Sequence, residues 1–262
     1  MTAGEIKSLG APLLIAGYCL FSFLETRYHY SGFGKSRWQH ARRNLLVSVV
    51  NLLSLGALAS GLWQASLWAE AHRIGLFWSW PIPDTPLVSV GIFFGYDLLN
   101  YGIHRSLHRF EFLWKTHRVH HSDHYLDATS SFFFNPIESV YRALLQLIFI
   151  LSVGVNIRIL AIYQVWSIFA LLFAHANLRL PKWFGVAFGW FLVLPTNHRV
   201  HHSDRREEHD GNYGIGFMIW DLIFRTFTPP DAENQKRIGL KIYPRELTVL
   251  ETLCDPWTKR EV

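Results

Sequence analysis

Cysteine is almost absent from this chain of 262 residues. One of its two cysteines, Cys19, lies in an apolar stretch and the other, Cys254, in a polar segment, so neither is placed to reach the other and no disulfide is expected. The net charge of +5 comes without a nucleic-acid-binding motif. Nucleic acid is therefore not an expected partner, and the basic excess fits contact with anionic lipid headgroups.

Two motifs of redox enzymes are also missing. The Glu-x-x-His pair, with which soluble dinuclear iron oxygenases hold their metal, does not occur. There is no GxGxxG segment after a strand, so the chain has no evident flavin or nicotinamide site. Any redox chemistry would need another type of metal ligand and a separate source of electrons.

Long apolar blocks dominate what is present. Half of the residues are hydrophobic, with 11 Trp and 20 Phe. The blocks approach the ~20 residues of a membrane-spanning helix, which favours a membrane protein over a soluble one with a large core. The first block is expected to be an uncleaved helix, because no small-x-small cleavage site ends it. The five expected spans are residues 11–24, 45–69, 86–103, 137–155 and 159–175.

The distribution of basic residues predicts the orientation. The segment between the first two blocks is rich in Lys and Arg and should face the cytoplasm. The next loop, residues 70–85, includes Asp84 and should lie outside. Counting onward, residues 104–134 and everything after His175 are cytoplasmic, while residues 156–158 form a tight external turn. A bacterial inner membrane or an endoplasmic reticulum fits this topology. The basic residues are Arg27, Lys35, Arg37, Arg42 and Arg43, beside the single acid Glu25.

One heptapeptide, His-Arg-Val-His-His-Ser-Asp, occurs twice, at residues 117–123 and 198–204. Its histidines fall at positions i, i+3 and i+4, which share one face of a helix. Each copy is therefore predicted to present three imidazoles to one point. A duplication with ligand spacing indicates metal binding rather than a solvated His-rich helix. The predicted ligands are His117, His120, His121, His198, His201 and His202.

A further pair, His104 and His108, has i, i+4 spacing. With the two copies it gives eight imidazoles, more than one tetrahedral or octahedral ion uses, so a dinuclear centre is predicted. Imidazole suits iron, zinc, copper or nickel, and spacing does not choose among them. His175, at the end of the last apolar block, is included as a ninth ligand. His124 and His209 extend the two copies but break the face pattern, so they are expected to be surface or supporting residues. His29, His40 and His72 lack partners at ligand spacing and are excluded.

Asp97 and Tyr101 lie on the same helical stripe as His104 and His108. They are positioned to hydrogen-bond the ligands or to line a channel for a lipid-borne substrate. An ionisable residue in an apolar block is unfavourable unless it has a partner, which makes Asp97 a functional candidate. The alternative, given equal weight, is a structural bond from Asp97 to a neighbouring span.

The other polar residues of the copies have open roles. Asp123 and Asp204 are expected either to accept hydrogen bonds from imidazole N–H groups or only to cap local turns. Arg118 and Arg199 project away from the three-histidine face, so we expect them to meet lipid headgroups or acidic neighbours.

The order HxxxH, HxxHH, HxxHH on a chain with several spans resembles the fatty acid hydroxylase superfamily, which includes sterol desaturases, sphingolipid hydroxylases and alkylglycerol monooxygenase. The likeness covers residues 97–227, including Trp114 and the segments 173–177 and 210–214. Many relatives have His before a Pro-x-Glu segment, whereas this chain has Asn135. Asn135 is therefore a candidate for supporting the site or shaping the substrate end, with consequences for the reaction.

The resemblance implies an all-α, polytopic membrane fold with a cytosolic histidine-rich cap over a dinuclear site. It implies two iron ions held by the eight histidines of the boxes, activation of O2, and hydroxylation of a lipid C–H bond. Electrons would come from a separate reductase, ferredoxin or cytochrome b5-like protein. The expected regions are membrane helices in 1–85, a catalytic domain in 86–227 and, in 228–262, a soluble tail or a cap beneath the site. Aromatic side chains expected to wall a substrate slot are Phe132, Phe133, Phe134, Trp166, Phe169 and Phe173.

Three other interpretations stay open at this point. A lipid or sterol desaturase would use the same metal site and remove a second hydrogen. A metal transporter or non-catalytic metal-binding protein would be expected to carry ionisable residues within several spans. A bis-histidine haem protein would place paired histidines on facing helices inside the bilayer.

Overall fold

A computed structural model of the chain describes residues 10–32, 37–80, 82 and 85–259. Within these residues every regular element is a helix, and the β contacts are isolated bridges. The predicted all-α class is confirmed. Lys35 and Asp84, which contributed to the predicted orientation, lie outside the described residues.

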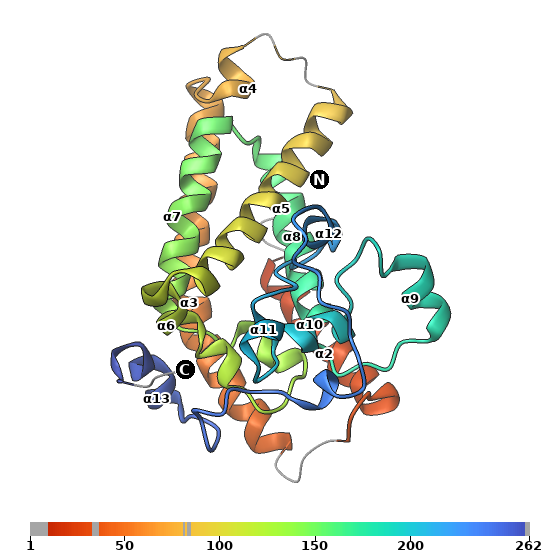
Figure 1. Ribbon diagram of the computed structural model, residues 1–262. Coiled ribbons are helices and arrows are strands. Elements are labelled where there is room, and N and C mark those ends of the chain that lie inside the picture. Colours follow the sequence, from red (N-terminus) through yellow and green to blue (C-terminus); the bar gives the residue numbers. More distant parts are fainter. Residues whose placement is uncertain (1–9, 33–36, 81, 83–84, 260–262) are drawn as a thin grey trace.

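Five long helices form an upright bundle (Figure 1). They are α2 (Gly10–Tyr28), α3 (Arg37–Ala71), α5 (Pro86–Arg109), α7 (Pro136–Val153) and α8 (Ile157–His175). α3 and α7 run side by side, α2 packs against α8, and α5 crosses the bundle obliquely. Buried apolar side chains, among them Trp63, Ile92, Ile150 and Leu160, fill the space between α3, α5, α7 and α8.

Local sequence determines where these helices begin and end. Prolines open α5 and α7, where no partner for a backbone N–H is needed, and the preceding Thr85 and Asn135 cap the first turn. α7 ends at Val153, its C-cap Gly154 has a left-handed φ of 78°, and Asn156 caps α8. The chain thus turns tightly between α7 and α8, close to the turn predicted at residues 156–158. Gly75, before α4 (Leu76–Ser79), packs on this turn, since a Cβ there would lie 2.3 Å from the nitrogen of Gly154.

The number of membrane spans differs from the prediction. Among the described helices, α7 and α8 are long and apolar enough to cross a membrane. A third span is reached if the segments 37–51 and 56–79, which meet at a bend of 41°, count as one. The five spans of the sequence analysis are therefore not supported. α2 falls short because its last turns are charged, and α5 because Asp97 and Asn100 interrupt its apolar run.

Buried polar side chains tie the bundle to the loop that follows the first histidine copy. The carboxylate of Glu25 accepts hydrogen bonds from the backbone nitrogens of Ala128 and Asn177, at 2.8 and 2.9 Å. Asn51 of α3 donates to the carbonyl oxygens at both ends of the segment 132–134. These bonds position the loop because its backbone groups would otherwise be buried without partners.

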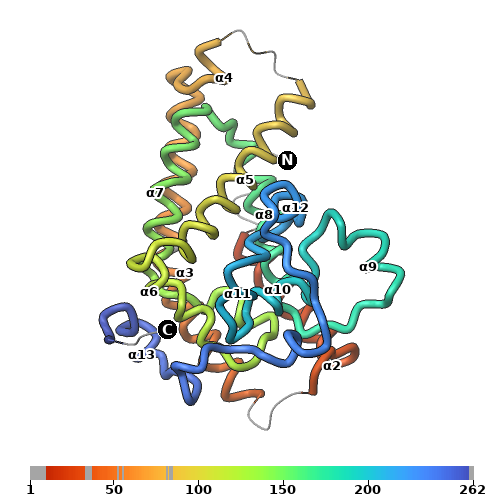
Figure 2. The backbone as a smooth tube through the Cα atoms, viewed as in Figure 1, coloured from red at the N-terminus to blue at the C-terminus, as the bar shows by residue number. Residues whose placement is uncertain are grey.

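Shorter helices gather around the lower half of the bundle (Figure 2). They carry the histidine copies and the connections between them. They are α6 (Glu111–His117), η1 (His120–Ser122), η2 (Ala128–Phe132), α9 (Lys182–Phe188), α10 (Pro195–His201), α11 (Arg206–His209) and α12 (Ile219–Ile223).

The C-terminal segment folds back onto these elements. It contains η3 (Asn234–Lys236), α13 (Val249–Cys254) and η4 (Asp255–Trp257), and α13 lies against α3. Its main anchor is a buried ion pair, in which Nε of Arg118 donates to a carboxylate oxygen of Asp255 at 2.9 Å. Arg118 thus meets an acidic neighbour, one of the two surroundings predicted for it. Residues 228–259 are packed beneath the histidines rather than extending away from the molecule.

Candidate metal centre

Nine histidines converge in two adjoining groups, which together we call the cage. Within each group the ligand-capable ring nitrogens lie within 4.8 Å of one another, and all nine residues are buried. The rings of His121 and His202, one from each group, stack with 4.5 Å between centroids. The structure therefore brings together all nine predicted ligands. The five-histidine group is His104, His108, His117, His121 and His201, and the four-histidine group is His120, His175, His198 and His202.

Each copy of the heptapeptide serves both groups. In the first copy the i and i+4 histidines belong to the five-histidine group, and the i+3 histidine, His120, belongs to the other. In the second copy the i and i+4 histidines belong to the four-histidine group, and His201 crosses over. The prediction that each copy presents three imidazoles to one point is wrong. Adjacent residues of a helix point about 100° apart, so neighbouring histidines face different centres.

The two copies also differ in backbone conformation. The first copy starts at the last residue of α6, passes through a turn and continues in the 3-10 helix η1. The second starts in the α-helix α10, which opens with Pro195, ends at His201 and has His202 as its C-cap. The surroundings, and not the local sequence, therefore choose the conformation of this heptapeptide.

Two long helices deliver the remaining histidines. α5 supplies His104 and His108, one turn apart. α8 supplies its last residue, His175, whose Nε2 lies 3.0 Å from Nε2 of His120 and 3.1 Å from Nε2 of His198. The bundle thus fixes three of the nine rings directly, because these helices are held by the apolar core above them.

Hydrogen bonds on the outer side orient five of the rings. In each ring Nδ1 faces an oxygen that only accepts, so in the neutral imidazole Nδ1 carries the hydrogen and Nε2 keeps its lone pair. For His117 the acceptor is the carboxylate of Glu138, at 2.8 Å. For the others it is a backbone carbonyl, in the pairs His104–Tyr213 (2.7 Å), His120–Phe133 (2.9 Å), His175–Leu171 (2.9 Å) and His201–Gly211 (2.7 Å).

The inner sides of these rings face one another without hydrogen atoms between them. Nε2 of His104 lies 3.1 Å from Nε2 of His117 and 3.0 Å from Nε2 of His201. All three nitrogens carry lone pairs, so no hydrogen bond joins them and their mutual contact is repulsive. A metal cation at their meeting point would turn this repulsion into coordination. In the four-histidine group, Nε2 of His120 and Nε2 of His175 face each other in the same way. The ring nitrogens of the cage are therefore suitable ligands for metal.

Burial keeps the cage imidazoles in the form that binds metal. It lowers the pKa of His121, His198, His201 and His202, because a protonated ring would lose its hydration and lie beside other rings. Neutral imidazole is the metal-binding form. Both ring nitrogens of His121 are buried without a hydrogen-bond partner among the described residues. Such orphaned nitrogens are rare unless a ligand satisfies them.

Asp97 and Tyr101 link helices. Asp97 accepts hydrogen bonds from Tyr163 Oη at 2.8 Å and from Trp220 Nε1 at 2.7 Å, which joins α5 to α8 and α12. This corresponds to the structural alternative weighed for it in the sequence analysis. The Tyr101 hydroxyl lies 2.8 Å from Oγ1 of Thr226. Neither side chain bonds a cage histidine in the part of the chain that the structure describes.

Asn135 caps α7 and holds the C-terminal segment. Its Oδ1 accepts from the backbone nitrogen of Ile137, and its Nδ2 donates to the carbonyl oxygens of Thr252 and Leu253, both at 3.1 Å. An amide suits this place because it donates and accepts at once. The contacts of Asn135 are therefore with the backbone of α7 and α13.

Glu138 supports the cage most directly among residues that the sequence analysis did not single out. One carboxylate oxygen accepts from His117, and the other accepts from Arg142 Nε at 2.7 Å. One feature of the sequence could have identified Glu138: it is an acid in the first turn of a helix that starts close to the first histidine copy. His209, left as a surface or supporting residue, is buried and stacks on Trp114 at 5.1 Å, beside the cage.

His40 was excluded for lack of partners, yet it forms a third group with Asp123 and Glu246. Arg43 donates to Asp123 at 2.6 Å and lies 3.2 Å from Glu246. Because the guanidinium of Arg43 already pairs with both carboxylates, we assign this group as an ion-pair network and not as a cation site. His40 and Glu246 are 206 positions apart, so spacing alone does not reveal the pair.

A cavity of about 570 Å³ lies among α2, α3, α7 and α8. Most of its wall is apolar, and Ser139 and Arg142 line it next to Glu138. From η2 it is lined by Phe132, whose neighbour Phe133 holds His120 through its carbonyl oxygen. Of the aromatic residues expected to wall a slot, Phe132 lines this cavity. The cavity thus borders the residues that orient the cage.

Comparison with known proteins identifies the chain's relatives. The sequence model of the fatty acid hydroxylase family matches residues 89–226, more than half of the chain. This stretch contains all nine cage histidines and Glu138. No solved structure matches the chain.

Three curated relatives illustrate the range of the similarity. Human alkylglycerol monooxygenase is 29% identical over 65% of this chain and 35% of its own length. Ornithine lipid hydroxylase OlsE of Rhizobium tropici is 26% identical over 63% of this chain and 48% of its own length. Human lathosterol oxidase is 24% identical over 89% of this chain and 78% of its own length. The chain spans about a third of the length of the alkylglycerol monooxygenases it matches.

Proposed function

Because this chain belongs to the fatty acid hydroxylase family, we propose that it is a membrane-bound oxidoreductase that hydroxylates a lipid C–H bond with O2 and external electrons. The observation that carries the proposal is the cage, in which groups of five and four buried histidines turn bare Nε2 atoms toward one another. We assign all nine histidines as ligands of a dinuclear centre.

The metal in this proposal is a pair of iron ions. Imidazole donors suit iron, zinc, copper or nickel, and membership of the family favours iron. When bound, iron would supply the redox chemistry that activates O2 for removal of hydrogen from the substrate.

The chain's own residues hold the ligands in place. Backbone carbonyls fix the rings of His104, His120, His175 and His201. Glu138 accepts the Nδ1 hydrogen of His117, which fixes the orientation of that ring. The rings therefore need little reorganisation when metal or O2 binds.

The cavity among α2, α3, α7 and α8 suits the hydrocarbon part of a lipid. Its wall is mostly apolar, and α7 and α8 are the helices best suited to lie in a bilayer, so a lipid would enter without crossing water. Ser139 and Arg142 place polar groups where the cavity approaches the supports of the cage. Apolar walls also exclude water from the reacting carbon.

In this proposal the cage lies on the cytoplasmic side of a bacterial inner membrane or an endoplasmic reticulum. The chain lacks a recognisable cofactor motif for a flavin or nicotinamide. A reductase, ferredoxin or cytochrome b5-like protein would supply the electrons.

Desaturation on the same site is the second candidate, favoured by the similarity to lathosterol oxidase. The two reactions differ in product, which gains one oxygen in hydroxylation and loses two hydrogens in desaturation. A metal transporter or non-catalytic metal protein would give neither product.

The test is lipid conversion by the purified, iron-loaded protein in nanodiscs, with O2, a chemical reductant and total lipid extracts as substrates. Mass spectrometry is expected to detect a lipid one oxygen heavier, with the label retained from ¹⁸O2. His201→Ala should abolish the product and lower bound iron.

The matched control is His124→Ala, which removes an exposed histidine next to the first copy and outside the cage. It should retain iron and product. A loaded protein without any oxidised or desaturated lipid would contradict the proposed function, and full activity of His201→Ala would remove that residue from the ligand set.

A further inference from the structure

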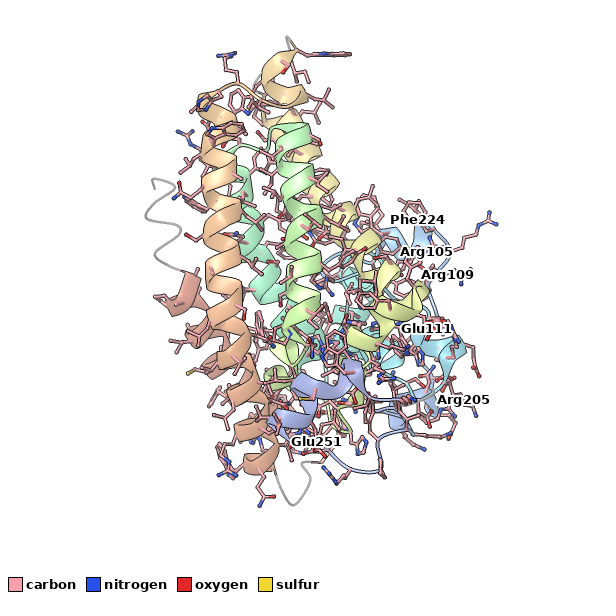
Figure 3. The ribbon with its side chains drawn as sticks, turned by 90° about the vertical axis from the view of Figure 1, so that its left-hand side faces the viewer. Arg105, Arg109, Glu111, Arg205, Phe224 and Glu251 are labelled. Atoms are coloured by element: carbon pink, nitrogen blue, oxygen red, sulfur yellow. The ribbon has the colours of Figure 1, made fainter. Side chains whose placement is uncertain are left out.

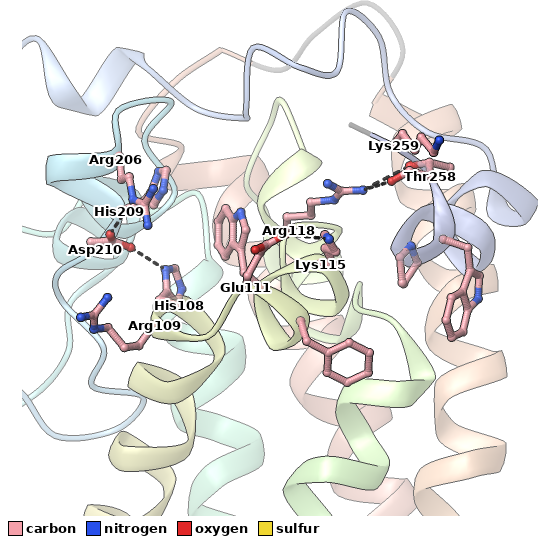
Figure 4. Close-up of a pocket in the computed structure, with 14 residues that line it drawn as sticks. His108, Arg109, Glu111, Lys115, Arg118, Arg206, His209, Asp210, Thr258 and Lys259 are labelled. Carbon is pink, nitrogen blue, oxygen red and sulfur yellow. Dashed lines mark hydrogen bonds and ion pairs between the residues drawn. The ribbon is translucent and has the colours of Figure 1, made fainter. Parts of the chain in front are cut away.

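The cage comes close to the molecular surface at one pocket, shown in Figure 4. It has a volume of about 790 Å³ and opens between α6, α11 and η4. His108 of the five-histidine group forms part of its wall, together with Trp114 and His209. The cavity among α2, α3, α7 and α8 is lined by other residues. This pocket therefore gives access to the cage by another route.

The rim of this pocket carries more positive than negative charge. Lys115 pairs with Glu111 at 2.8 Å, and Arg206 pairs with Asp210 at 3.1 Å. Arg118, which also lines the pocket, pairs with Asp255 at 2.9 Å. The other two cations, at positions 109 and 259, form no ion pair with the residues that the structure describes. Figure 3 shows the exposed end of α5 on this side of the molecule. We call Arg109, Lys115, Arg206 and Lys259 the basic rim.

Aromatic rings connect the basic rim to the cage. The ring of Trp114 lies 4.9 Å from the ring of His108 and 5.3 Å from that of His121, measured between centroids. On its other side Trp114 stacks on His209, with 15° between the ring planes. A tryptophan in contact with two cage histidines and with the pocket offers an electron a short path through packed rings.

We propose that the basic rim is the docking surface for a small acidic protein that carries one electron at a time. This inference rests on the proposed function. Inserting one atom of O2 into a C–H bond and reducing the other to water consumes two electrons and two protons, so the carrier is oxidised twice per turnover. Electron-transfer complexes use small contact areas, and complementary charge speeds their encounter. Trp114 and His108 would pass the electrons to the metal.

The test uses a reduced acidic [2Fe–2S] ferredoxin as the probe and a charge-reversed rim, Arg109→Glu with Lys259→Glu. The iron-loaded protein is mixed with the probe by stopped flow, and the second-order rate of probe oxidation is followed at several salt concentrations. We expect the rate to fall about tenfold in the variant and to lose most of its salt dependence. Binding of the probe to zinc-loaded protein, which transfers no electrons, should weaken in parallel.

Two comparisons keep this test separate from the proposed function. Arg245→Glu removes an exposed cation that pairs with Glu251 elsewhere on the surface, and it should leave the rate unchanged. Single turnover driven by dithionite should be unaffected in the rim variant, while its failure in the unaltered protein would count against the proposed function alone.

Equal ferredoxin rates in the unaltered and rim-reversed proteins would overturn the docking proposal. So would dithionite-driven turnover that depends on anionic lipid in the unaltered protein and loses this dependence in the rim variant, because the rim would then bind a lipid headgroup.

Discussion

The two copies of the heptapeptide are identical in sequence and differ in nearly everything that the fold does with them. The first copy runs from a helix end through a turn into a 3-10 helix, and the second is mostly α-helical. The first gives two histidines to the five-histidine group and one to the other, and the second does the reverse. The pairing is therefore reciprocal, and each group depends on both copies.

The polar residues of the copies diverge as well. Arg118 lies in a buried ion pair with Asp255, whereas Arg199 packs over the ring of Tyr30 at 5.3 Å without an acidic partner among the described residues. Asp123 is buried against Arg43, whereas the corresponding Asp204 pairs with an exposed lysine. A repeated ligand motif can thus keep its histidines in use while the residues between them are taken up by different structural tasks.

The largest effects are expected at the two histidines that cross between groups. His120→Ala leaves three ligands in its group, and His201→Ala leaves four in its group. Both should abolish turnover, and each should release about half of the iron, with the larger loss in His120→Ala because fewer ligands remain. Inductively coupled plasma mass spectrometry after dialysis measures the iron bound per protein and shows which variant loses more. Equal iron in the two variants would contradict the unequal division into five and four.

Arg118→Met should destabilise the protein by about 3 kcal/mol, because it leaves the carboxylate of Asp255 buried without its cation. Arg199→Met should change stability by less than about 1 kcal/mol, since a cation above an aromatic ring is the contact it loses. Denaturant unfolding in detergent measures both. If both substitutions lowered the free energy of unfolding by similar amounts, the two arginines would contribute equally to stability despite their different contacts.

Glu138→Gln should lower metal affinity or kcat about 10- to 100-fold, because His117 loses the anionic acceptor of its Nδ1 hydrogen. The corresponding histidine of the second copy, His198, has no Nδ1 partner among the described residues. The control is Asp210→Asn, whose carboxylate lies 3.4 Å from His108 and is partly exposed, so a change below about threefold is expected. A competition titration with a chelator provides the affinities.

The smallest contrast is expected between the two aspartates. Asp123→Asn should cost about 2 kcal/mol, because its carboxylate accepts from Arg43, Asn44 and Ser130 in the interior. Asp204→Asn should cost less than about 1 kcal/mol, because its partner Lys241 is exposed and its other partner, Arg237, lies 4.0 Å away. Melting temperatures of the two variants in the same detergent provide the comparison. A larger decrease for Asp204→Asn than for Asp123→Asn would contradict the expectation that Asp123 contributes more to stability.

The sequence predicted which histidines meet, because ligand spacing is a property of residue identity and order. It did not predict how they divide, since the assumption of one helix face per copy ignores the 100° step between His201 and His202 and the 3-10 turn at His120. The apolar blocks predicted membrane helices, and the resemblance to the family implied the all-α class. The number of spans did not, because the polar residues inside α5 reduce its hydropathy without preventing a helix.

Other parts of the site depend on contacts that no local pattern encodes. The approach of Glu138 to His117 depends on how α6 and α7 pack. The network of His40 with Glu246 joins residues from opposite ends of the chain. The contacts of Asn135 with Thr252 and Leu253 likewise require the C-terminal segment to be in place.

The buried pair of Arg118 and Asp255 has a consequence for biosynthesis. Asp255 is made 137 residues after Arg118, which lies inside the first histidine copy. A nascent chain that has not yet reached Asp255 would hold an uncompensated guanidinium beside half-assembled ligands. Metal is therefore expected to be loaded after Asp255 has been added and has paired with Arg118, and a chain shortened before position 255 should reach the membrane but retain little iron.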